Sequence, residues 1–490
     1  MIINAKSLGV STLQTDVAII GGGASGLTLA GHLNRDLIVI EAGNFRVNPE
    51  RDKSLVFETT GREMNTQSLR RQLLGGAGAL WAGRCAALNP IDFEKRDWVN
   101  HSGWPITYED LNPHYAIARK ALSLREPDAL LKTNTPLKNN ITDHFEYLDL
   151  ELWQYAFAAP EVPIHFGKLY APIFEGKNKN LLVNAEATRI ETEGNRITVL
   201  HVVDPSGRHL EIRAKHFVLA CGCVEVNRFL LDNEPNNEAL IRPVKKWLGH
   251  GFHQHLLIDG GQIEASHKNS KLLQKSLNRF RNKPAYSHEL GLKISQTAAK
   301  KFEVANMSAT FKYTPRPIHS PLSALGLASS KLRGREPIFW KPKISIELST
   351  EQDIVYGHKV SLGSKTDKNG RRNASVHWNI NEFELLSACK MNTFVSEGLK
   401  RNVIGQLDRF HSPQDMRDQP MRESLHHMGG ARMSEGPSTG VVDKNLTLHG
   451  SANLSITGGA VFPTGGHVNP TLTMMALSIK LAEFLNDIEA

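Results

Sequence analysis

The pattern of apolar and polar residues begins with a strand, a glycine-rich turn and a helix. The first long apolar run, at 17–20, is continuous rather than alternating, which is typical of a parallel strand covered on both faces. Glycine-rich residues 21–26 follow it at once, and apolar residues then recur through Leu33 at helical spacing. A second continuous run, at 37–40, ends in Glu41. Strand, turn, helix and strand in this order predict a βαβ unit.

Apolar runs of the same kind return in the middle of the chain. Residues 217–220 form a continuous run that passes through Gly222 into a helical pattern at 224–231. A buried strand that enters a helix through glycine predicts a return to the first sheet, which makes this domain discontinuous. Further strands of this region are predicted at 181–183, 190–203 and 210–212.

The composition changes between about 262 and 417. Residues 267–283 are rich in Lys and Arg, and residues 315–342 are rich in Pro and irregular. Apolar residues within the Pro-rich stretch are expected to form a lid or a membrane-touching segment, or simply to pack: Leu322, Leu325, Leu327, Ile338, Phe339 and Trp340. Strands are predicted at 343–351, 355–362 and 374–378. These features favour a sheet-based substrate domain with a cover.

Length and composition indicate a soluble protein of two domains. The chain has 490 residues, of which 40% are hydrophobic and 22% charged. No apolar run approaches the ~18 residues that a membrane-spanning helix needs, and residues 1–14 lack the pattern of a secretory signal. We therefore expect a cytoplasmic protein without membrane contact.

The charge and cysteine content identify no partner or metal. The formal charge is +8, which permits acidic partners but is equally explained by a solvated basic surface, and no nucleic-acid partner is predicted. Cys85, Cys221, Cys223 and Cys389 lack any Cys/His spacing typical of zinc. Buried free thiols and no metal site are expected.

The first glycine-rich turn has the spacing of a dinucleotide-binding loop. Gly21, Gly23 and Gly26 would let the backbone approach a pyrophosphate, while the amides of the following helix point at its charge. Glu41, at the end of the next strand, would accept the ribose hydroxyls and repel a 2′-phosphate. This context favours FAD or NAD over NADP.

A second glycine-rich passage covers residues 70–85. It has no strand alternation, which suggests backbone packed against something flat, although a structural loop of tight turns would look the same.

The last seventy or so residues contain a third group of motifs. His426 and His427 precede Met428 and two glycines, and Asn469 and Pro470 precede an apolar helix that runs through Ala482. Pro470 suits the first helical position, which would place Asn469 at the N-cap and the Thr471 amide toward whatever lies ahead of the helix.

Together these motifs resemble the glucose-methanol-choline (GMC) oxidoreductases, in the branch of pyranose oxidase and related sugar and polyol dehydrogenases. The resemblance covers residues 21–41, 75–85, Trp104-Pro105 with the helix that follows, 218–231 and 425–485. It does not extend to residues 262–417, where the substrate is chosen.

The predicted fold class is therefore α/β, with a discontinuous Rossmann-like FAD-binding domain interleaved with a β-sheet-based (α+β) substrate-binding domain. The FAD-binding domain is expected at 12–90, 178–262 and 419–490, and the substrate-binding domain with its lid at 91–177 and 263–418.

The resemblance also implies which residues hold FAD. The first loop would bind the ADP part, the second would lie along the pyrophosphate and reach the flavin N5 edge, and the C-terminal residues would close over the pyrophosphate and approach the flavin pyrimidine. The implied set is Gly21, Gly23, Ala24, Ser25, Gly26, Glu41, Gly75, Gly76, Gly78, Ala79, Leu80, Trp81, Ala82, Ala187, Cys221, Gly222, Gly459, Ala460, Asn469, Pro470 and Thr471. Several relatives have a covalently bound histidine where this chain has Leu80, so noncovalent FAD is predicted.

The resemblance places the catalytic pair at His426 and Asn469, and the residue types agree with that role. Oxidation of an alcohol needs a base for the hydroxyl proton while hydride leaves the carbon, and an imidazole suits this task. Asn469 would hold the same hydroxyl. His427 is expected to be a packed neighbour or a substrate contact, and His467 either faces substrate or serves as a plain hydrogen-bonding residue.

The predicted function is FAD-dependent oxidation of a sugar, aminosugar, glycoside or polyol hydroxyl to a carbonyl. Only one dinucleotide fingerprint is present, so hydride is expected to pass directly to FAD, while the acceptor (O2, quinone or redox protein) and the oligomeric state stay open. The alternatives are a redox-neutral flavin enzyme such as a lyase, a simple or secondary alcohol dehydrogenase, and a noncatalytic flavoprotein that binds a partner or membrane through residues 315–342. A disulfide reductase would need a redox cysteine pair, whereas Cys221 and Cys223 belong to the strand-to-helix turn.

Overall fold

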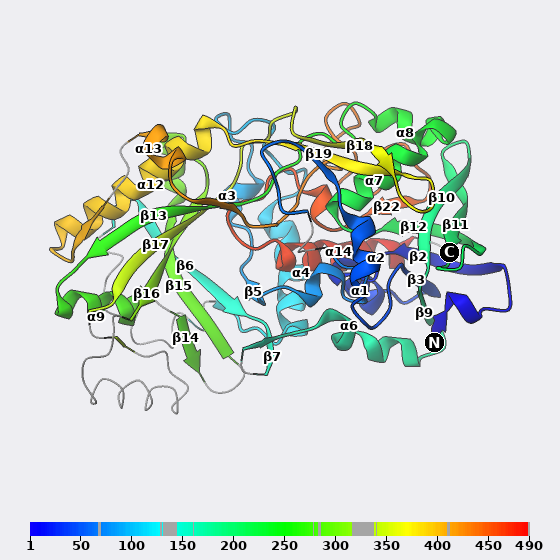
Figure 1. The fold of residues 1–490 in the computed structure, drawn as a ribbon, viewed down its shortest axis with the longest axis horizontal. Helices are drawn as coiled ribbons and strands as arrows, with labels where there is room; N and C mark the ends of the chain where they lie inside the picture. Colours follow the sequence, from blue (N-terminus) through cyan, green and yellow to red (C-terminus); the bar gives the residue numbers. More distant parts are fainter. Residues whose placement is uncertain are drawn as a thin grey trace.

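Two large sheets stand at opposite ends of the long axis of the molecule, and both chain termini lie beside the first of them (Figure 1). The computed structural model describes residues 1–66, 70–127, 130, 145–159, 161–277, 279–282, 286–315, 338–339, 341–408 and 412–488. Most of the expected lid, including Leu322, Leu325, Leu327 and Trp340, lies outside the described residues.

The first sheet is the predicted nucleotide-binding sheet. Its core is parallel, because β2 pairs in parallel with both β3 and β12, and every residue of β3 is buried. The strand order is β1 (Ile2–Asn4), β9 (Lys179–Val183), β3 (Leu37–Glu41), β2 (Thr12–Ile20), β12 (His209–Leu219), β11 (Arg196–Val203) and β10 (Glu186–Glu193), with β22 (Leu454–Ile456) also on β12.

This order explains how distant parts of the sequence meet. The strands β2, β12 and β22 come from the beginning, middle and end of the chain, and they run parallel to one another. Their carboxyl ends therefore open at one edge of the sheet, where ligands of such folds bind. Three helices of this half are α1 (Ala24–His32), α4 (Tyr108–Ala121) and α14 (Thr471–Asp487), and α14 packs against the other two.

The second sheet is antiparallel and forms the other half of the molecule. Helix α12 (Glu382–Arg401) packs on it against β13, β16 and β17. The strand order is β20 (Gln406–Leu407), β13 (Leu256–Glu264), β17 (Lys343–Thr350), β16 (Met307–Thr314), β15 (Tyr286–Ile294), β6 (Leu148–Tyr155) and β5 (Arg84–Cys85), with β14 (Arg279–Asn282) on β15 and β21 (Met421–Glu423) on β13.

Two of the predicted strands differ from expectation. The strand expected at 355–362 begins later, as β18 (Lys359–Thr366), because residues 356–357 form a turn. With β19 (Arg372–Trp378) and β4 (Glu58–Gly61) it forms a separate sheet that packs on α7 (Cys223–Asn233), beside the first sheet. Shorter elements are α2 (Pro49–Asp52), α3 (Pro90–Phe93), β7 (Phe157–Ala159), β8 (Val162–Pro163), α6 (Phe166–Leu169), α8 (Glu238–Ile241), α9 (His267–Ser276), α10 (Gln296–Phe302) and α13 (Pro413–Arg417).

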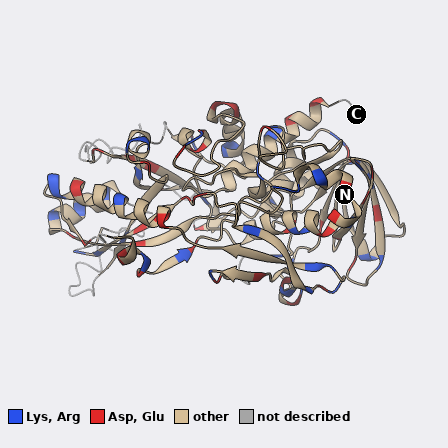
Figure 2. Cartoon of the chain, turned by 90° about the horizontal axis from the view of Figure 1, so that it is seen from above, with Lys and Arg blue, Asp and Glu red and all other residues tan. Residues whose placement is uncertain are grey.

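The surface carries charges of both signs. Basic and acidic residues are interspersed over both halves of the molecule rather than separated onto faces (Figure 2). Among the described residues, no helix is long and apolar enough to cross a bilayer.

Candidate active site

A cavity of about 490 Å³ lies at the carboxyl edge of the first sheet. Most of the predicted site residues line this cavity, including members of both glycine-rich passages, of the C-terminal motifs and of the catalytic pair. They are Gly21, Gly23, Ala24, Ser25, Glu41, Gly76, Gly78, Leu80, Trp81, Ala82, Ala187, Cys221, Gly222, His426, His427, Gly459, Asn469, Pro470 and Thr471. Gly26, Gly75, Ala79, Ala460 and His467 are not in its wall.

The first glycine turn has a conformation that only glycine accommodates. Gly21 has φ +112°, and a Cβ on it would lie 2.6 Å from the Ala220 carbonyl oxygen. A Cβ on Gly26 would lie 2.0 Å from the Gly21 carbonyl oxygen. The turn therefore brings the amino end of α1 directly onto the end of β2, with its amides at the cavity.

The second glycine-rich passage lies against the first. The Gly75 amide donates to the Gly22 carbonyl at 2.7 Å, and residues 76–78 and 80–82 then line the cavity. Within this segment the Trp81 indole is anchored on the Ile164 carbonyl at 2.7 Å, whereas the Leu80 side chain is 43% exposed. An aliphatic side chain here offers no atom for a bond to FAD.

Glu41 holds a buried carboxylate at the end of β3. Its two oxygens accept hydrogen bonds from the Gly22 amide at 2.9 Å and the Gly43 amide at 2.7 Å. Burial raises the pKa of Glu41 to about 7, against the opposing effect of these two bonds and of Arg51. Further lone pairs remain on a carboxylate that accepts two bonds, so the group is able to receive hydroxyl donors from the cavity.

These features fit the adenosine and pyrophosphate parts of FAD. The glycine turn provides close backbone approach, the start of α1 provides amide donors, and Glu41 provides an acceptor for a ribose. When bound, FAD would be held by residues from both glycine-rich passages and from the C-terminal segment.

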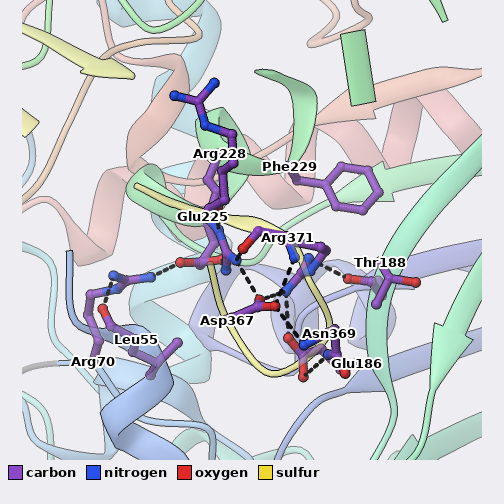
Figure 3. A network of polar contacts seen from close by, with 12 residues as sticks. Leu55, Arg70, Glu186, Thr188, Glu225, Arg228, Phe229, Asp367, Asn369 and Arg371 are labelled. Carbon is purple, nitrogen blue, oxygen red and sulfur yellow. Dashed lines mark hydrogen bonds and ion pairs between the residues drawn. The ribbon is translucent and has the colours of Figure 1, made fainter. Parts of the chain in front are cut away.

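An ion-pair network that sequence reasoning missed forms one side of the cavity (Figure 3). Arg371, from the β18–β19 hairpin, donates to the Ala187 carbonyl at 3.0 Å and pairs with Glu186 at 2.5 Å. The network also joins Arg70 and Arg228 to Glu225, and Arg228 and Arg371 to Asp367. Three guanidinium groups thus face three carboxylates beside the cavity, and the Lys368 ammonium lies 3.9 Å from Glu186 as a fourth cation.

The two cysteines near the cavity are free thiols. Cys221 lines the cavity, and burial raises its pKa to about 12. Cys223 begins α7 and its thiol donates to the Gly429 carbonyl at 3.3 Å. Both lie in the strand-to-helix turn as expected, and neither is in a disulfide.

His426 and Asn469 meet in the wall of the cavity. His426 follows Leu425, whose backbone is left-handed at φ +66°, and its Nε2 lies 3.1 Å from Asn469 Nδ2. Burial lowers the pKa of His426 to about 4, and the nearby Arg84 guanidinium adds to the effect. The imidazole is therefore neutral at pH 7 and able to accept a proton.

The predicted N-cap role of Asn469 is wrong. The helical hydrogen bonds begin one residue later, since the Met474 amide donates to the Pro470 carbonyl at 2.9 Å and α14 begins at Thr471. Pro470 takes the capping position, and the Asn469 amide group is free to reach His426 instead.

The two remaining histidines differ in their placement. The His427 ring lines the cavity between the Phe57 and Phe252 rings, and burial lowers its pKa to about 3. His467 is buried and its Nε2 lies 2.9 Å from the Glu151 carboxylate, away from the cavity wall. Its placement accords with the plain hydrogen-bonding alternative.

Two further residues near His426, Arg84 and His255, belong to no motif that the sequence analysis identified as part of the site. Arg84 lines the cavity, stacks over the Trp153 ring at 3.9 Å and pairs with Glu289 at 2.9 Å. His255 Nδ1 lies 3.0 Å from His426 Nδ1. Within the described residues, no cluster of His, Cys, Asp or Glu is arranged to hold a metal ion.

Comparisons with known proteins show which proteins this chain resembles. A family model for GMC oxidoreductases matches residues 359–478. The large subunit of fructose dehydrogenase from Gluconobacter japonicus is 22% identical, over 98% of this chain and 99% of that protein. The 6'''-hydroxyparomomycin C oxidase of Streptomyces lividus is 21% identical, over 95% of this chain and 90% of that protein.

Solved structures confirm the predicted fold class. Pyridoxine 4-oxidase from Mesorbium loti is 14% identical with a TM-score of 0.62, over 97% of this chain and 100% of that chain. Formate oxidase is 15% identical with a TM-score of 0.61, over 97% of this chain and 99% of that chain.

Proposed function

Because this chain is a GMC oxidoreductase, and thus an FAD enzyme, we propose that it oxidises a hydroxyl group of a sugar, aminosugar, glycoside or other polyol to a carbonyl. The observation that carries the proposal is the pairing of His426 Nε2 with Asn469 Nδ2 in the wall of the cavity that fits FAD. A neutral imidazole can take a hydroxyl proton, and an amide donor beside it can hold the hydroxyl oxygen in place.

The chain's own residues carry the proton half of this reaction. Asn469 donates a hydrogen bond to the substrate hydroxyl oxygen and fixes its position, while His426 Nε2 takes the hydroxyl proton as the O–H bond breaks. When bound, FAD would supply the acceptor for the hydride of the carbinol carbon, so that loss of one proton and one hydride would convert the alcohol to a carbonyl. The low pKa of His426 keeps it in the proton-accepting form across the physiological range.

The residues of the cavity wall support a proposal for the cofactor contacts. We assign the ribose hydroxyls to Glu41, the pyrophosphate to the glycine turn at the start of α1, and the flavin ring to the segment 76–82 and the start of α14. Leu80 in place of a histidine makes the attachment noncovalent. Gly26 and Gly75 act by shaping the backbone rather than by touching FAD.

The substrate class rests on the named relatives. Fructose dehydrogenase and 6'''-hydroxyparomomycin C oxidase are named for polyhydroxylated molecules, and both align with nearly the whole chain. The word "subunit" in the first name makes a protein partner a candidate electron acceptor, beside O2 and quinones. A cytoplasmic location remains a prediction.

The test is an anaerobic absorbance titration of the purified, FAD-loaded protein with sugars, glycosides, polyols and simple alcohols. We expect one polyhydroxylated class to bleach the flavin band, and His426→Ala, with its FAD content unchanged, to abolish the bleaching. Admission of air then tells an oxidase from a dehydrogenase. Bleaching by simple alcohols alone would reject the sugar assignment, and bleaching by the His426→Ala protein at the wild-type rate would reject the base.

A further inference from the structure

The base His426 has a second buried histidine on its far side. His255 is 1% exposed, and its Nδ1 lies 3.0 Å from Nδ1 of His426, the nitrogen that faces away from Asn469. The two rings are nearly perpendicular, at 80°, with their centroids 5.1 Å apart. This geometry joins the rings edge to edge through one hydrogen bond rather than by stacking.

Strand pairing fixes this contact. His255 stands directly before β13 and His426 a few residues after β21, and these strands pair antiparallel with Leu256 opposite Glu423. The pairing continues past the strands, because both the Ser424 amide and its hydroxyl donate to the His255 carbonyl, at 3.1 and 3.0 Å. Backbone hydrogen bonds of the paired strands therefore hold the two histidines next to each other.

The other nitrogen of His255 determines where the protons lie. His255 Nε2 is 3.1 Å from the Gly465 carbonyl oxygen, which only accepts, so Nε2 carries a proton. A neutral His255 then has a lone pair on Nδ1, and the hydrogen bond to His426 requires the proton to be on His426 Nδ1. His426 Nε2 is left unprotonated, facing the Asn469 amide donor.

We propose that His255 is a positioning residue that holds His426 in the tautomer with a free Nε2 and receives a hydrogen bond from its Nδ1 when Nε2 becomes protonated. This rests on the proposed function, in which His426 Nε2 is the base. Contacts run from Gly465 through His255 and His426 to Asn469. They fix the orientation of the His426 ring and determine which of its nitrogens carries the proton, as an acidic residue does in other histidine sites.

The charges around the pair favour this neutral arrangement. His467 and His253 are the other titratable groups near His255, and the Arg84 guanidinium is the charge that acts on His426. Among the described residues, the hydrogen-bond partners of the two imidazoles are each other, the Gly465 carbonyl and Asn469, so His255 Nδ1 is the group that accepts the hydrogen bond from His426 Nδ1.

Matched substitutions at His255 separate positioning from packing. The His255→Asn side chain places an oxygen near the position of Nδ1 and so keeps the acceptor for His426. The His255→Gln side chain keeps a donor for the Gly465 carbonyl, and His255→Leu keeps only the volume of the side chain. We expect the rate of flavin reduction in FAD-loaded protein to fall at least about tenfold in His255→Gln and His255→Leu, and to stay within about threefold in His255→Asn. The low-pH limb of the rate profile should move to lower pH in His255→Leu, because the imidazolium has lost its acceptor.

His253→Leu is the control for removal of a buried histidine. His253 is 1% exposed on the same segment, but its Nδ1 bonds the Gly251 carbonyl at 2.9 Å rather than His426. We expect His253→Leu to lower the melting temperature while leaving the pH profile of flavin reduction in place. An equal loss of rate in His255→Asn and His255→Leu would reduce His255 to a packing residue and overturn the proposal.

A readout independent of turnover is the nitrogen NMR spectrum of the FAD-loaded protein labelled on its histidine rings, with His426 assigned from the His426→Gln spectrum. The proposal requires a protonated Nδ1 and an unprotonated Nε2 on His426, and loss of this pattern in His255→Leu. A proton on Nε2 in the wild type would overturn it even if an alcohol substrate is never found. Normal tautomers with a fully active His426→Ala protein would instead reject the proposed function.

Discussion

Asn469 Nδ2 lies 3.1 Å from His426 Nε2, although the two residues belong to different segments on either side of β22. The contact exists because α14 begins at Thr471 rather than one residue earlier, which leaves the Asn469 side chain out of the helix cap. The amide is therefore a donor already aimed at the atom that would receive the substrate proton.

Removal of this donor should slow the chemical step more than it weakens binding. We expect Asn469→Ala to lower the rate constant for flavin reduction by on the order of 10²-fold, because a hydrogen bond to the reacting oxygen strengthens as charge develops. Rapid-mixing absorbance with FAD-saturated protein measures this constant apart from substrate affinity. An unchanged rate constant, with only a higher KM, would mean that Asn469 binds the hydroxyl without assisting its deprotonation.

The parts of the site that the sequence predicts are those made by local chemistry. The glycine turn at 21–26 and the acid at Glu41 follow from spacing along one βαβ unit, and the structure places them on the cavity. The family resemblance predicts His426 and Asn469 as a pair, but the spacing of the residues along the chain does not itself bring the two side chains together. That meeting depends on the β13–β21 and α14 packing, which no short segment specifies.

The residues that the sequence does not reveal are held by long-range pairing. His255 has no motif, and only its place just before the apolar run of β13 hints that it is fixed at a sheet end. The Arg228 network joins residues from several segments, including a hairpin that the apolar pattern assigns to the other sheet. A hydrophobic pattern shows that a strand exists but not which sheet it joins.

Two glycines of the first loop should respond differently to an added methyl group. Gly26→Ala places Cβ 2.0 Å from the Gly21 carbonyl oxygen, so we expect destabilisation of the apoprotein by roughly 1–3 kcal/mol or failure to fold. A Cβ on Gly23 would have no other atom of the described chain within 4 Å, so Gly23→Ala should melt like the wild type and yet bind FAD more weakly. Thermal unfolding and FAD titration of the two apoproteins measure this, and equal melting temperatures would contradict the steric argument.

Glu41 should make the stability of the apoprotein depend on pH. Its folded pKa is raised from 4.5 to about 7, so the native state binds more protons than the unfolded state between these values. The contribution of Glu41 to the free energy of unfolding is therefore fully present below about pH 4.5 and is lost as the pH rises to about 7. Denaturant unfolding of wild-type and Glu41→Gln apoproteins at pH 5 and pH 8 measures this, because other buried groups such as Glu384 titrate in both proteins, and only the stability of the wild type relative to the variant should fall from pH 5 to pH 8. A free energy of unfolding that instead rises with pH relative to the variant would show that the amide donors stabilise the Glu41 carboxylate more than burial destabilises it.

Arg228 is the most enclosed cation of the network beside the cavity, and its loss should be costly. Its side chain is 4% exposed and pairs with Asp367 at 2.5 Å, itself 2% exposed, and with Glu225 at 3.1 Å. We expect Arg228→Ala to lower the free energy of unfolding by about 3–5 kcal/mol, because buried carboxylates lose their partner. Arg228→Ala combined with Asp367→Asn should recover part of this loss. The exposed pair of Arg401 and Glu146 provides the control, since Arg401→Ala should leave the free energy of unfolding almost unchanged. Urea unfolding of these variants beside the wild type measures each free energy of unfolding. If the loss in the double variant equals the sum of the losses in Arg228→Ala and Asp367→Asn, Arg228 acts through packing rather than through charge.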